Sequence, residues 1–339
     1  MVKPKQHILV IRLSAMGDVA MTVPVLRALI KNYPDIKITV LTREFFAPFF
    51  RDLSNVTVFP AEVKKRHKGV LGLWKLSNEL KVFKIDAIAD LHNVLRSQIL
   101  KLFFFGKQTI QIDKGRAEKK ALVSGENFQQ LKTTHQRYAD VFNKLGYNLD
   151  LSNPTFPERA VLSTEMQVFL RHNFKKIIGI APFAAHAGKM YPLNLMKQVI
   201  EALSKDYQIV LFGGGKQEIE ALTAIENSFD NVVNAAGKLN LNEELDLISN
   251  LDGMLAMDSG NAHMAAMMGV KTITIWGVTH PFAGFAPFNQ PNDYALVANK
   301  DEFPEIPTSI FGNKYPENYK EAAGSITPET VVRKVTEVF

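Results

Sequence analysis

A segment near residue 260 places an acid, a hydroxyl, a glycine and a histidine where a helix should begin. The apolar run 253–257 predicts a buried parallel strand, and residues 258–260 predict the turn and cap that start the next helix. Backbone N–H groups at a helix start are free to bind an anion, and the helix dipole favours negative charge there. We therefore expect a diphosphate at this point, with His263 one turn into the helix.

Two other loops in the second half of the chain also follow predicted strands and suit a nucleotide diphosphate. In the first, Lys189 precedes a helix, so its ammonium would neutralise phosphate charge. In the second, a glycine turn around Gly214 would let a nucleoside lie close to the backbone, with Glu218 or Glu220 bonding a ribose hydroxyl. Each feature alone also fits an ordinary surface loop. Because the carboxyl ends of parallel strands share one edge of a sheet, the three loops together predict one pocket.

The first loop of the chain carries a carboxylate instead of a dinucleotide fingerprint. Residues 12–18 hold a single glycine, whereas a dinucleotide site requires three, which argues against an NAD enzyme. Asp18 stands at the mouth of a helix predicted over 19–30, at a strand end where ligands bind. Spacing alone leaves two interpretations of Asp18 open, a helix cap and a catalytic base.

The formal charge of +6 is unevenly distributed. Residues 61–120 hold fourteen Lys and Arg against six Asp and Glu, and the densest basic run, 64–68, is followed by apolar residues that include Leu71 and Trp74. This pattern is compatible with a solvated helical face or with contact to an anionic membrane or phosphorylated acceptor, where each nearby Lys or Arg contributes about 1 kcal/mol. Nucleic acid is a weaker option, because no aromatic ladder interleaves the run.

Composition limits the class of protein. A chain of 339 residues that is 46% hydrophobic buries a large core and most simply forms two domains. It has no cysteine, so disulfides and thiolate metal sites are excluded and a reducing compartment is expected. Arg12 interrupts the first apolar run too early for a signal peptide, and no apolar run approaches the roughly 20 residues needed to span a bilayer. We expect a cytoplasmic protein whose membrane contacts are peripheral.

Strand and helix patterns alternate in both halves of the chain, which predicts an α/β protein with parallel sheets. A helix over 241–251 opens with a capping box from Asn240 to Glu243, and residues 327–339 predict a closing helix. Prolines and polar residues at 151–157 mark the expected junction between the domains. The strands are predicted at 7–12, 36–41, 56–59, 87–91, 176–181, 208–212, 232–235, 253–257 and 271–276.

The chain resembles glycosyltransferase family 9, the bacterial ADP-heptose:lipopolysaccharide heptosyltransferases. The resemblance covers nearly the whole length and rests on residues 13–19 with Pro24 and Leu26, on 90–97, on 189–192 and on 258–269. It implies a GT-B fold, in which two Rossmann-like, doubly wound domains, 1–155 and 156–324, face a cleft and the C-terminal helix 325–339 packs back on the first domain. It also implies an inverting transfer that needs no metal and no other cofactor.

The resemblance assigns roles to individual residues. Asp18 matches the family's general base, and Asp258 would contact the heptose or orient its loop. The nucleotide-sugar-binding set is Lys189, Glu218, Asp258, Ser259, Gly260, Asn261, His263, Ala184, Ala185 and Gly214, and the acceptor-binding set is Lys64, Arg66 and Arg96. The implied partners are an ADP-heptose donor, an anionic lipopolysaccharide-core acceptor and the cytoplasmic face of the inner membrane, with no nucleic acid.

The chain departs from the family pattern at several positions. Ala184 and Ala185 stand where hydroxyl residues are common, Tyr191 where Trp is usual, and Asn261 where an apolar residue or Pro is usual. These changes bear on the sugar and the nucleotide, so a family 9 transferase with another sugar nucleotide is an alternative. A GT-B sugar-nucleotide epimerase would share the pocket and turn over without an acceptor. A two-lobed binding protein or a dehydrogenase fits less well.

Overall fold

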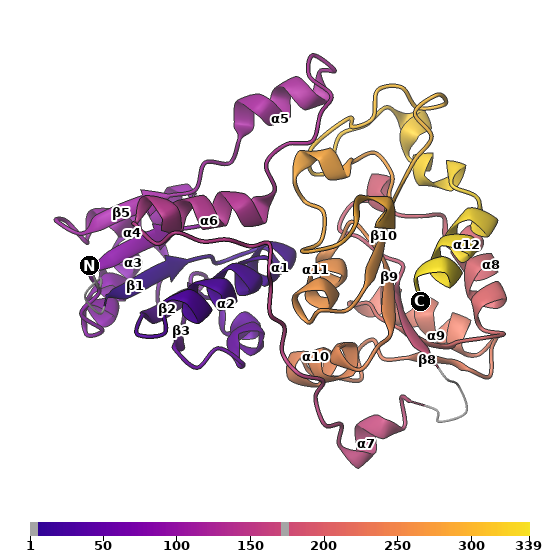
Figure 1. Ribbon diagram of the computed structural model, residues 1–339, viewed down its shortest axis with the longest axis horizontal. Coiled ribbons are helices and arrows are strands. Elements are labelled where there is room, and N and C mark those ends of the chain that lie inside the picture. Colours follow the sequence, from indigo (N-terminus) through magenta and orange to yellow (C-terminus); the bar gives the residue numbers. More distant parts are fainter. Residues whose placement is uncertain (1–5, 171–175) are drawn as a thin grey trace. The chain divides into compact units, whose positions relative to one another are not determined.

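The computed structural model describes residues 6–170 and 176–339, so the basic start at residues 1–5 lies outside the described residues. The chain forms two compact units, each built around one parallel sheet (Figure 1). Unit 1 comprises Met1–Lys114 and Thr134–Thr155, and unit 2 comprises Gly115–Thr133 and Phe156–Phe339. Among the helices of the described residues, none combines the length and the apolar character needed to cross a bilayer.

Unit 1 contains a five-stranded sheet in the order β3-β2-β1-β4-β5, and its strand pairs are parallel. On one face Leu9 and Ile11 pack with side chains of α3 and α4, and elsewhere in the unit α2 contacts α6. The strands are β1 (His7–Ile11), β2 (Lys37–Thr42), β3 (Val56–Pro60), β4 (Ala87–Asp90) and β5 (Gln108–Gln111). The helices are α1 (Met16–Ala20), α2 (Thr22–Asn32), α3 (Gly69–Lys81), α4 (Leu95–Leu102) and α6 (Thr134–Lys144), with the 3₁₀ helix η1 (Glu44–Phe50).

Unit 2 contains a six-stranded parallel sheet in the order β8-β7-β6-β9-β10-β11. Its strands are β6 (Ile177–Ala181), β7 (Gln208–Leu211), β8 (Val232–Asn234), β9 (Gly253–Met257), β10 (Thr272–Trp276) and β11 (Ala295–Val297). Its α-helices are α5 (Arg116–Val123), α7 (Thr164–Gln167), α8 (Leu193–Leu203), α9 (Lys216–Glu226), α10 (Leu241–Ser249), α11 (Gly260–Met267) and α12 (Pro328–Val338). Its 3₁₀ helices are η2 (Ala187–Lys189), η3 (Pro281–Ala283), η4 (Asn292–Tyr294), η5 (Glu317–Tyr319) and η6 (Ala322–Ser325).

Each sheet reverses its strand order at one point. In unit 1 the chain leaves β1 toward β2 and β3 and then returns to β4 on the other side of β1. In unit 2 it leaves β6 toward β7 and β8 and returns to β9 on the other side of β6. The loops on the two sides of such a reversal diverge at the carboxyl ends of the strands and leave a crevice in which ligands bind. Ligand sites are therefore expected in the loops after β1, β4, β6 and β9.

The predicted strands are confirmed to within one residue at most ends, and the predicted capping box is confirmed as well. The Asn240 side chain accepts from the N–H of Glu243, and the Glu243 carboxylate accepts from the N–H of Asn240 at 2.8 Å. The edge strands β5 and β11 were not predicted, and the single helix expected over 19–30 is instead the pair α1 and α2.

The closing helix packs in unit 2, which corrects the expectation that it returns to the first domain. Val331, Val335 and Phe339 recur at every fourth position and lie in the unit 2 core, while α12 contacts α8. The preceding turn is held by the Tyr191 hydroxyl, which donates to the carbonyl of Ile326 at 2.7 Å. The apolar side of α12 is therefore already buried within unit 2.

A second correction concerns the segment Gly115–Thr133, which was expected in the first domain and belongs to unit 2. The Leu131 N–H donates to the Phe282 carbonyl at 2.9 Å, and Leu122 packs in a small cluster with Ala283. The chain therefore enters unit 2 once, returns to unit 1 for α6, and enters unit 2 again at Phe156.

Candidate functional site

The core of the candidate donor site is an ion pair at the strand reversal of unit 2. Lys189, at the end of η2, follows β6, and Asp258 follows β9. The Lys189 ammonium lies 2.7 Å from the Asp258 carboxylate, and the two side chains are only 15% and 7% exposed. Thr279, in the loop after β10, donates its hydroxyl to the same carboxylate oxygen at 2.9 Å. Three neighbouring strands thus each contribute one group to a single polar cluster.

A glycine makes room for the lysine. Gly312 adopts a φ of +73°, and a Cβ there would lie 2.4 Å from Cγ of Lys189. Any larger residue at 312 would displace the Lys189 stem or strain the backbone. The loop that carries Gly312 therefore packs directly against the aliphatic stem of Lys189.

The start of α11 supplies anion-binding groups beside Asp258. Ser259 is the N-cap residue in an extended conformation, and Gly260 and Asn261 begin the helix, so their N–H groups have no partner in a preceding turn. The hydroxyl oxygen of Ser259 is buried and makes no hydrogen bond within residues 6–170 and 176–339. Buried hydroxyls are nearly always bonded, so this one suits a ligand oxygen or an ordered water. His263 lies further along α11 and is buried.

The remaining predicted donor residues lie in adjacent loops. Glu218 accepts a hydrogen bond from the N–H of Gly214 at 2.8 Å, so it closes its own glycine turn after β7 instead of joining the Lys189–Asp258 pair. Ala184 packs against the unit 2 core, whereas Ala185 is exposed. Tyr191 is buried, and this burial raises the pKa of its phenol to about 12.

Asp18 forms the equivalent polar centre at the strand reversal of unit 1. Its carboxylate lies 2.6 Å from the guanidinium of Arg12 and accepts from the N–H of Ala15 at 3.2 Å. Arg12 in turn donates to the carbonyl of Leu91 at 2.7 Å, which ties the loop after β1 to the loop after β4. Asp18 therefore caps α1 and is also oriented by a nearly buried arginine. Its side chain remains 29% exposed, so a ligand can reach it.

The loop after β4 places a neutral histidine near this centre. Asp90 accepts hydrogen bonds from the N–H groups of His92 and Asn93, which turns the chain sharply at the strand end. Burial, together with the positive charges of Arg12 and Lys114, lowers the pKa of His92 to about 4. The His92 imidazole is therefore neutral at physiological pH.

The predicted acceptor-binding residues lie elsewhere in unit 1. The run 64–68 is a turn ahead of α3, so the interpretation of this run as a helical face is wrong. Arg66 already pairs with Glu62 at 2.9 Å and Glu79 at 3.4 Å, whereas Lys64 is exposed. Arg96 is exposed on α4.

Two residues that complete these centres were missed in the sequence. Arg12 directly follows β1, and its place six residues before the candidate base Asp18 could have indicated an ion pair between the two. Thr279 lies three residues beyond the end of β10, and only the fold places it beside Asp258.

Comparison with known proteins identifies relatives along most of the chain. Residues 73–306 match the model of glycosyltransferase family 9 (heptosyltransferase). The lipopolysaccharide core heptosyltransferase OpsX of Haemophilus influenzae is 26% identical over 297 residues, which cover 85% of this chain and 83% of that protein.

Solved structures share the architecture over the full length. A glycosyltransferase family 9 protein from Veillonella parvula superposes with a TM-score of 0.76 at 20% identity, covering 100% of this chain and 98% of that one. The E. coli heptosyltransferase WaaC with ADP-2-deoxy-2-fluoro heptose superposes with a TM-score of 0.67 at 19% identity, covering 98% and 99% of the two chains.

Proposed function

The chain belongs to glycosyltransferase family 9 and has the GT-B fold, and from this premise we propose that it transfers a heptose from ADP-heptose to the core saccharide of lipopolysaccharide or lipooligosaccharide. The observation that carries the proposal is the Lys189–Asp258 pair beside the start of α11. An enclosed ammonium and free helix N–H groups are what a departing diphosphate requires. The related OpsX is a lipopolysaccharide core heptosyltransferase, which supports the acceptor class.

In this proposal the donor diphosphate lies at the start of α11. Lys189 is the cation paired with Asp258 beside this helix start, and a phosphate oxygen would draw its ammonium away from, or share it with, Asp258. Asp258 would then be free to accept from a heptose hydroxyl, with Thr279 still holding one of its oxygens. The Ser259 hydroxyl and the N–H groups of Gly260 and Asn261 would complete the phosphate contacts. The WaaC complex with an ADP-heptose analogue supports adenine and heptose as the donor groups.

The proposed reaction inverts the anomeric centre. Asp18 takes the proton of the acceptor hydroxyl as its oxygen bonds to the anomeric carbon, and the bond from that carbon to the diphosphate oxygen breaks with its electron pair leaving on ADP. A carboxylate is a weak base toward an alcohol, but the hydroxyl becomes acidic as its bond to carbon forms. Arg12 holds the carboxylate in place, and Lys189 takes the role that a divalent cation has in many other transferases. No metal or other cofactor is part of the proposal.

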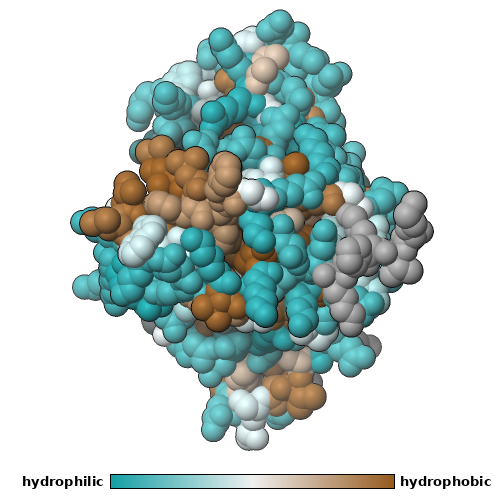
Figure 2. All heavy atoms as spheres, turned by 90° about the vertical axis from the view of Figure 1, so that its left-hand side faces the viewer, coloured by the Kyte–Doolittle hydropathy of each residue, from teal (hydrophilic) through white to brown (hydrophobic). Residues whose placement is uncertain are grey.

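We further propose that unit 1 meets the acceptor at the cytoplasmic face of the inner membrane. Residues 61–114 of unit 1 hold eleven Lys and Arg against five Asp and Glu. On the neighbouring helix α3, Leu71 and Trp74 are 81% and 54% exposed. Figure 2 faces the side of unit 1 that carries α3, α4 and β5, and it shows apolar side chains gathered next to hydrophilic ones. Such a surface matches an anionic lipid interface or an anionic lipid-linked sugar.

An assay with purified components tests the transfer. The protein is incubated with ADP-heptose and a heptose-deficient core acceptor, ADP release is measured, and the anomeric configuration of the product is read by NMR. We expect ADP release that depends on the acceptor and a product of inverted configuration. Turnover of the sugar nucleotide without acceptor would indicate an epimerase instead, and faster transfer from UDP- or GDP-sugars would contradict the proposed donor.

A further inference from the structure

His92 is a buried histidine that the proposed reaction does not use. It is 8% exposed and lies in the loop after β4, two residues beyond the end of that strand at Asp90. Its ring nitrogen Nδ1 is buried and makes no hydrogen bond within residues 6–170 and 176–339. A buried polar atom without a partner costs about 1–3 kcal/mol, so this nitrogen needs a ligand atom or an ordered water.

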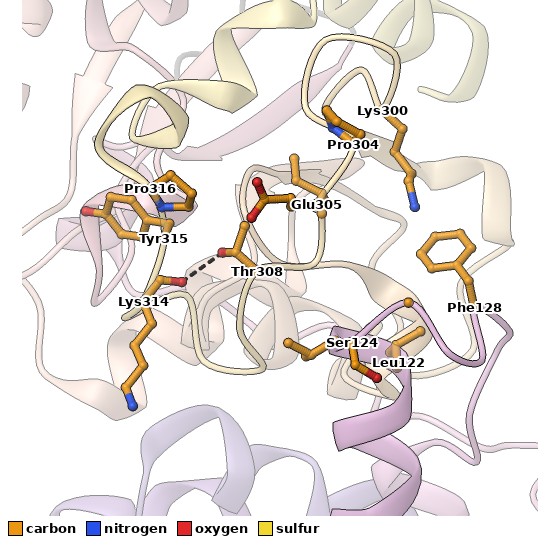
Figure 3. Close-up of a pocket in the computed structure, with 13 residues that line it drawn as sticks. Leu122, Ser124, Phe128, Lys300, Pro304, Glu305, Thr308, Lys314, Tyr315 and Pro316 are labelled. Carbon is orange, nitrogen blue, oxygen red and sulfur yellow. Dashed lines mark hydrogen bonds between the residues drawn. The ribbon is translucent and has the colours of Figure 1, made fainter.

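The pocket of about 760 Å³ in unit 2, between residues 122–128 and residues 300–316, has no such atom (Figure 3). The Lys300 ammonium lies 3.5 Å from the centre of the Phe128 ring, and the Lys314 side chain points away from the other labelled residues. The Thr308 hydroxyl donates to the carbonyl of Lys314 at 2.8 Å. None of the residues that line this pocket has a buried side-chain nitrogen or oxygen without a hydrogen bond, so the pocket gives no comparable indication of a ligand.

The backbone around His92 is held from several sides, so the unpartnered nitrogen does not belong to a loose loop. Asp90 accepts from the N–H groups of His92 at 3.0 Å and Asn93 at 2.8 Å. The Asp90 side chain is itself fully buried and pairs with the ammonium of Lys101 at 2.7 Å. The side-chain amide of Asn93 donates to the carbonyl of Ile112 at 3.0 Å. The loop therefore presents the imidazole from a fixed support.

The same loop is tied to the candidate base. Strand β4 pairs with β1 in parallel, so the loops after the two strands leave the sheet at neighbouring positions. Arg12, in the loop after β1, donates to the carbonyl of Leu91, the residue before His92, at 2.7 Å. The same guanidinium pairs with Asp18 at 2.6 Å. One arginine therefore connects the loop that carries the base with the loop that carries the histidine.

The charges around His92 determine which partners its ring suits. Burial and the positive charges of Arg12 and Lys114 lower its pKa, and the opposing effects of Asp90 and Asp18 are smaller. The ring is therefore neutral at physiological pH, with one N–H donor and one acceptor nitrogen. A hydroxyl can bond to Nδ1 in either tautomer, because it both donates and accepts. An anion would need the N–H at that position and would gain no charge from a neutral ring.

We infer that His92 hydrogen-bonds a hydroxyl of the acceptor sugar that neighbours the hydroxyl deprotonated by Asp18, and so selects and orients the acceptor. The inference rests on the proposed function, because it takes the acceptor to be a saccharide whose hydroxyl reaches Asp18. Holding a second hydroxyl of the same sugar ring would fix the direction in which the attacking oxygen points. His92 is in this view an acceptor-binding residue and not a second base.

Two substitutions test the contact in the transfer assay. His92→Leu removes both ring nitrogens, whereas His92→Asn keeps a polar atom attached to Cγ, where Nδ1 is attached in histidine. For His92→Leu we expect kcat/KM for the acceptor to fall about tenfold, the size of one lost hydrogen bond, while the Kd for ADP stays within about twofold. For His92→Asn we expect kcat/KM for the acceptor within about threefold of the wild type. His7→Leu, which loses a bond to Thr39 at the amino end of β1, is the matched control and should leave both constants unchanged.

Acceptors that lack one hydroxyl beside the attacked one identify the partner of His92. The wild type should lose about tenfold in kcat/KM when the bound hydroxyl is replaced by hydrogen, and His92→Leu should lose much less, because its contact is already absent. Equal losses in the two proteins with every such acceptor would overturn the inference.

Thermal unfolding separates this role from a structural one. Because Nδ1 has no partner among the described residues, His92→Leu removes a polar atom that is costly to bury, and its Tm should not fall below that of the wild type. A lower Tm together with unchanged acceptor kinetics would show that the histidine only supports the fold, which contradicts the inference.

A binding measurement decides the contact without turnover. The ring nitrogen signals of His92 are assigned by their loss in His92→Asn and followed by NMR as heptose-deficient core oligosaccharide is added in the presence of ADP. We expect the Nδ1 signal to shift, and an unchanged signal at saturating oligosaccharide would overturn the inference. If the wild type transfers no heptose, the proposed function fails, whereas an active wild type with an unchanged His92 signal rejects the His92 contact alone.

Discussion

The two candidate carboxylates are both paired with a cation, yet their surroundings suit different tasks. Asp258 is 7% exposed and is held by both Lys189 and Thr279, so it has little freedom to accept a proton from an incoming alcohol. Asp18 is 29% exposed, and its partner Arg12 is anchored on the carbonyl of Leu91 behind it. An open carboxylate on a fixed support is the better general base, whereas the enclosed one is better placed to orient the donor.

Replacing Asp18 by Asn tests the base. The amide keeps an oxygen for the Ala15 N–H, so the cap of α1 is retained, while the proton acceptor is lost. We expect kcat to fall by at least about 100-fold while the Kd for ADP stays within twofold of the wild-type value, as measured by steady-state kinetics and calorimetry. Asp52→Asn, a change of the same kind at an exposed position in unit 1, serves as control. Equal turnover of Asp18→Asn and wild type would reduce Asp18 to a helix cap.

Replacing Lys189 by Ala tests the diphosphate contact. The ammonium has phosphate charge to neutralise only when ADP is bound, so ADP should weaken about tenfold to a hundredfold and adenosine by less than about twofold. Calorimetry with both ligands gives the comparison, and Lys197→Ala on the exposed face of α8 controls for loss of a positive charge. A parallel loss of adenosine affinity would show that the variant disturbs the loop and not the phosphate contact.

Metal removal tests whether the diphosphate site needs a metal ion in addition to Lys189. If Lys189 and the start of α11 carry the leaving-group charge, EDTA should leave the rate of heptose transfer unchanged. The rate is measured by ADP release after dialysis against chelator, with and without added magnesium. Activity that disappears in EDTA and returns with magnesium would contradict the metal-free mechanism.

Among the helices and strands, the sequence predicts those that have a clear signal in their own residues, such as an apolar run or a cap. The central strands are continuous apolar runs because both faces of a parallel sheet are covered, and β9 with its following turn was predicted for that reason. The edge strand β5 has exposed polar ends and therefore no apolar run to detect, whereas β11 is a short apolar run, Ala295–Val297, that was not predicted. The ion pair of Lys189 with Asp258 joins loops far apart in the chain, which the strand order makes neighbours because β6 lies next to β9, and a single sequence does not display that order.

The packing of α12 in unit 2 predicts that shortening one of its buried side chains destabilises that unit. Val335 is fully buried in the unit 2 core, so Val335→Ala should lower the free energy of unfolding of unit 2 by about 2 kcal/mol. The chain has two tryptophans, exposed Trp74 in unit 1 and buried Trp276 in unit 2, so fluorescence in a Trp74→Phe background reports unit 2 alone. The exposed Arg333→Ala on the same helix is the control. No change of the Trp276 transition in Val335→Ala would contradict the packing of α12 on unit 2.

In the molecule as a whole, positive charge and large exposed apolar side chains are concentrated in unit 1. Helices α3 and α4 contact each other, and each ends or begins near large exposed apolar side chains, among which Phe105 is 99% exposed and Leu102 is 75% exposed. Apolar groups of this size next to a basic turn are rare on a surface without a partner. A bilayer interface accommodates both, because lysines meet anionic headgroups while Trp and Leu enter the acyl boundary.

Vesicle binding tests whether unit 1 meets an anionic membrane. Arg66 is already paired with two glutamates, so the charges available to lipid in this turn are those of Lys64, Lys65 and Lys68, and the triple change to Gln should reduce flotation with anionic vesicles. The loss should shrink at high salt, since exposed charges are screened over about 10 Å at 0.1 M.

Trp74 fluorescence should shift to the blue on binding, whereas Trp276 is already buried. Lys197, Lys205 and Lys271 changed together to Gln provide a charge-matched control in unit 2, and ADP affinity should stay constant in both variants. Equal binding of the wild type to neutral and anionic vesicles would leave the basic turn as an ordinary solvated surface.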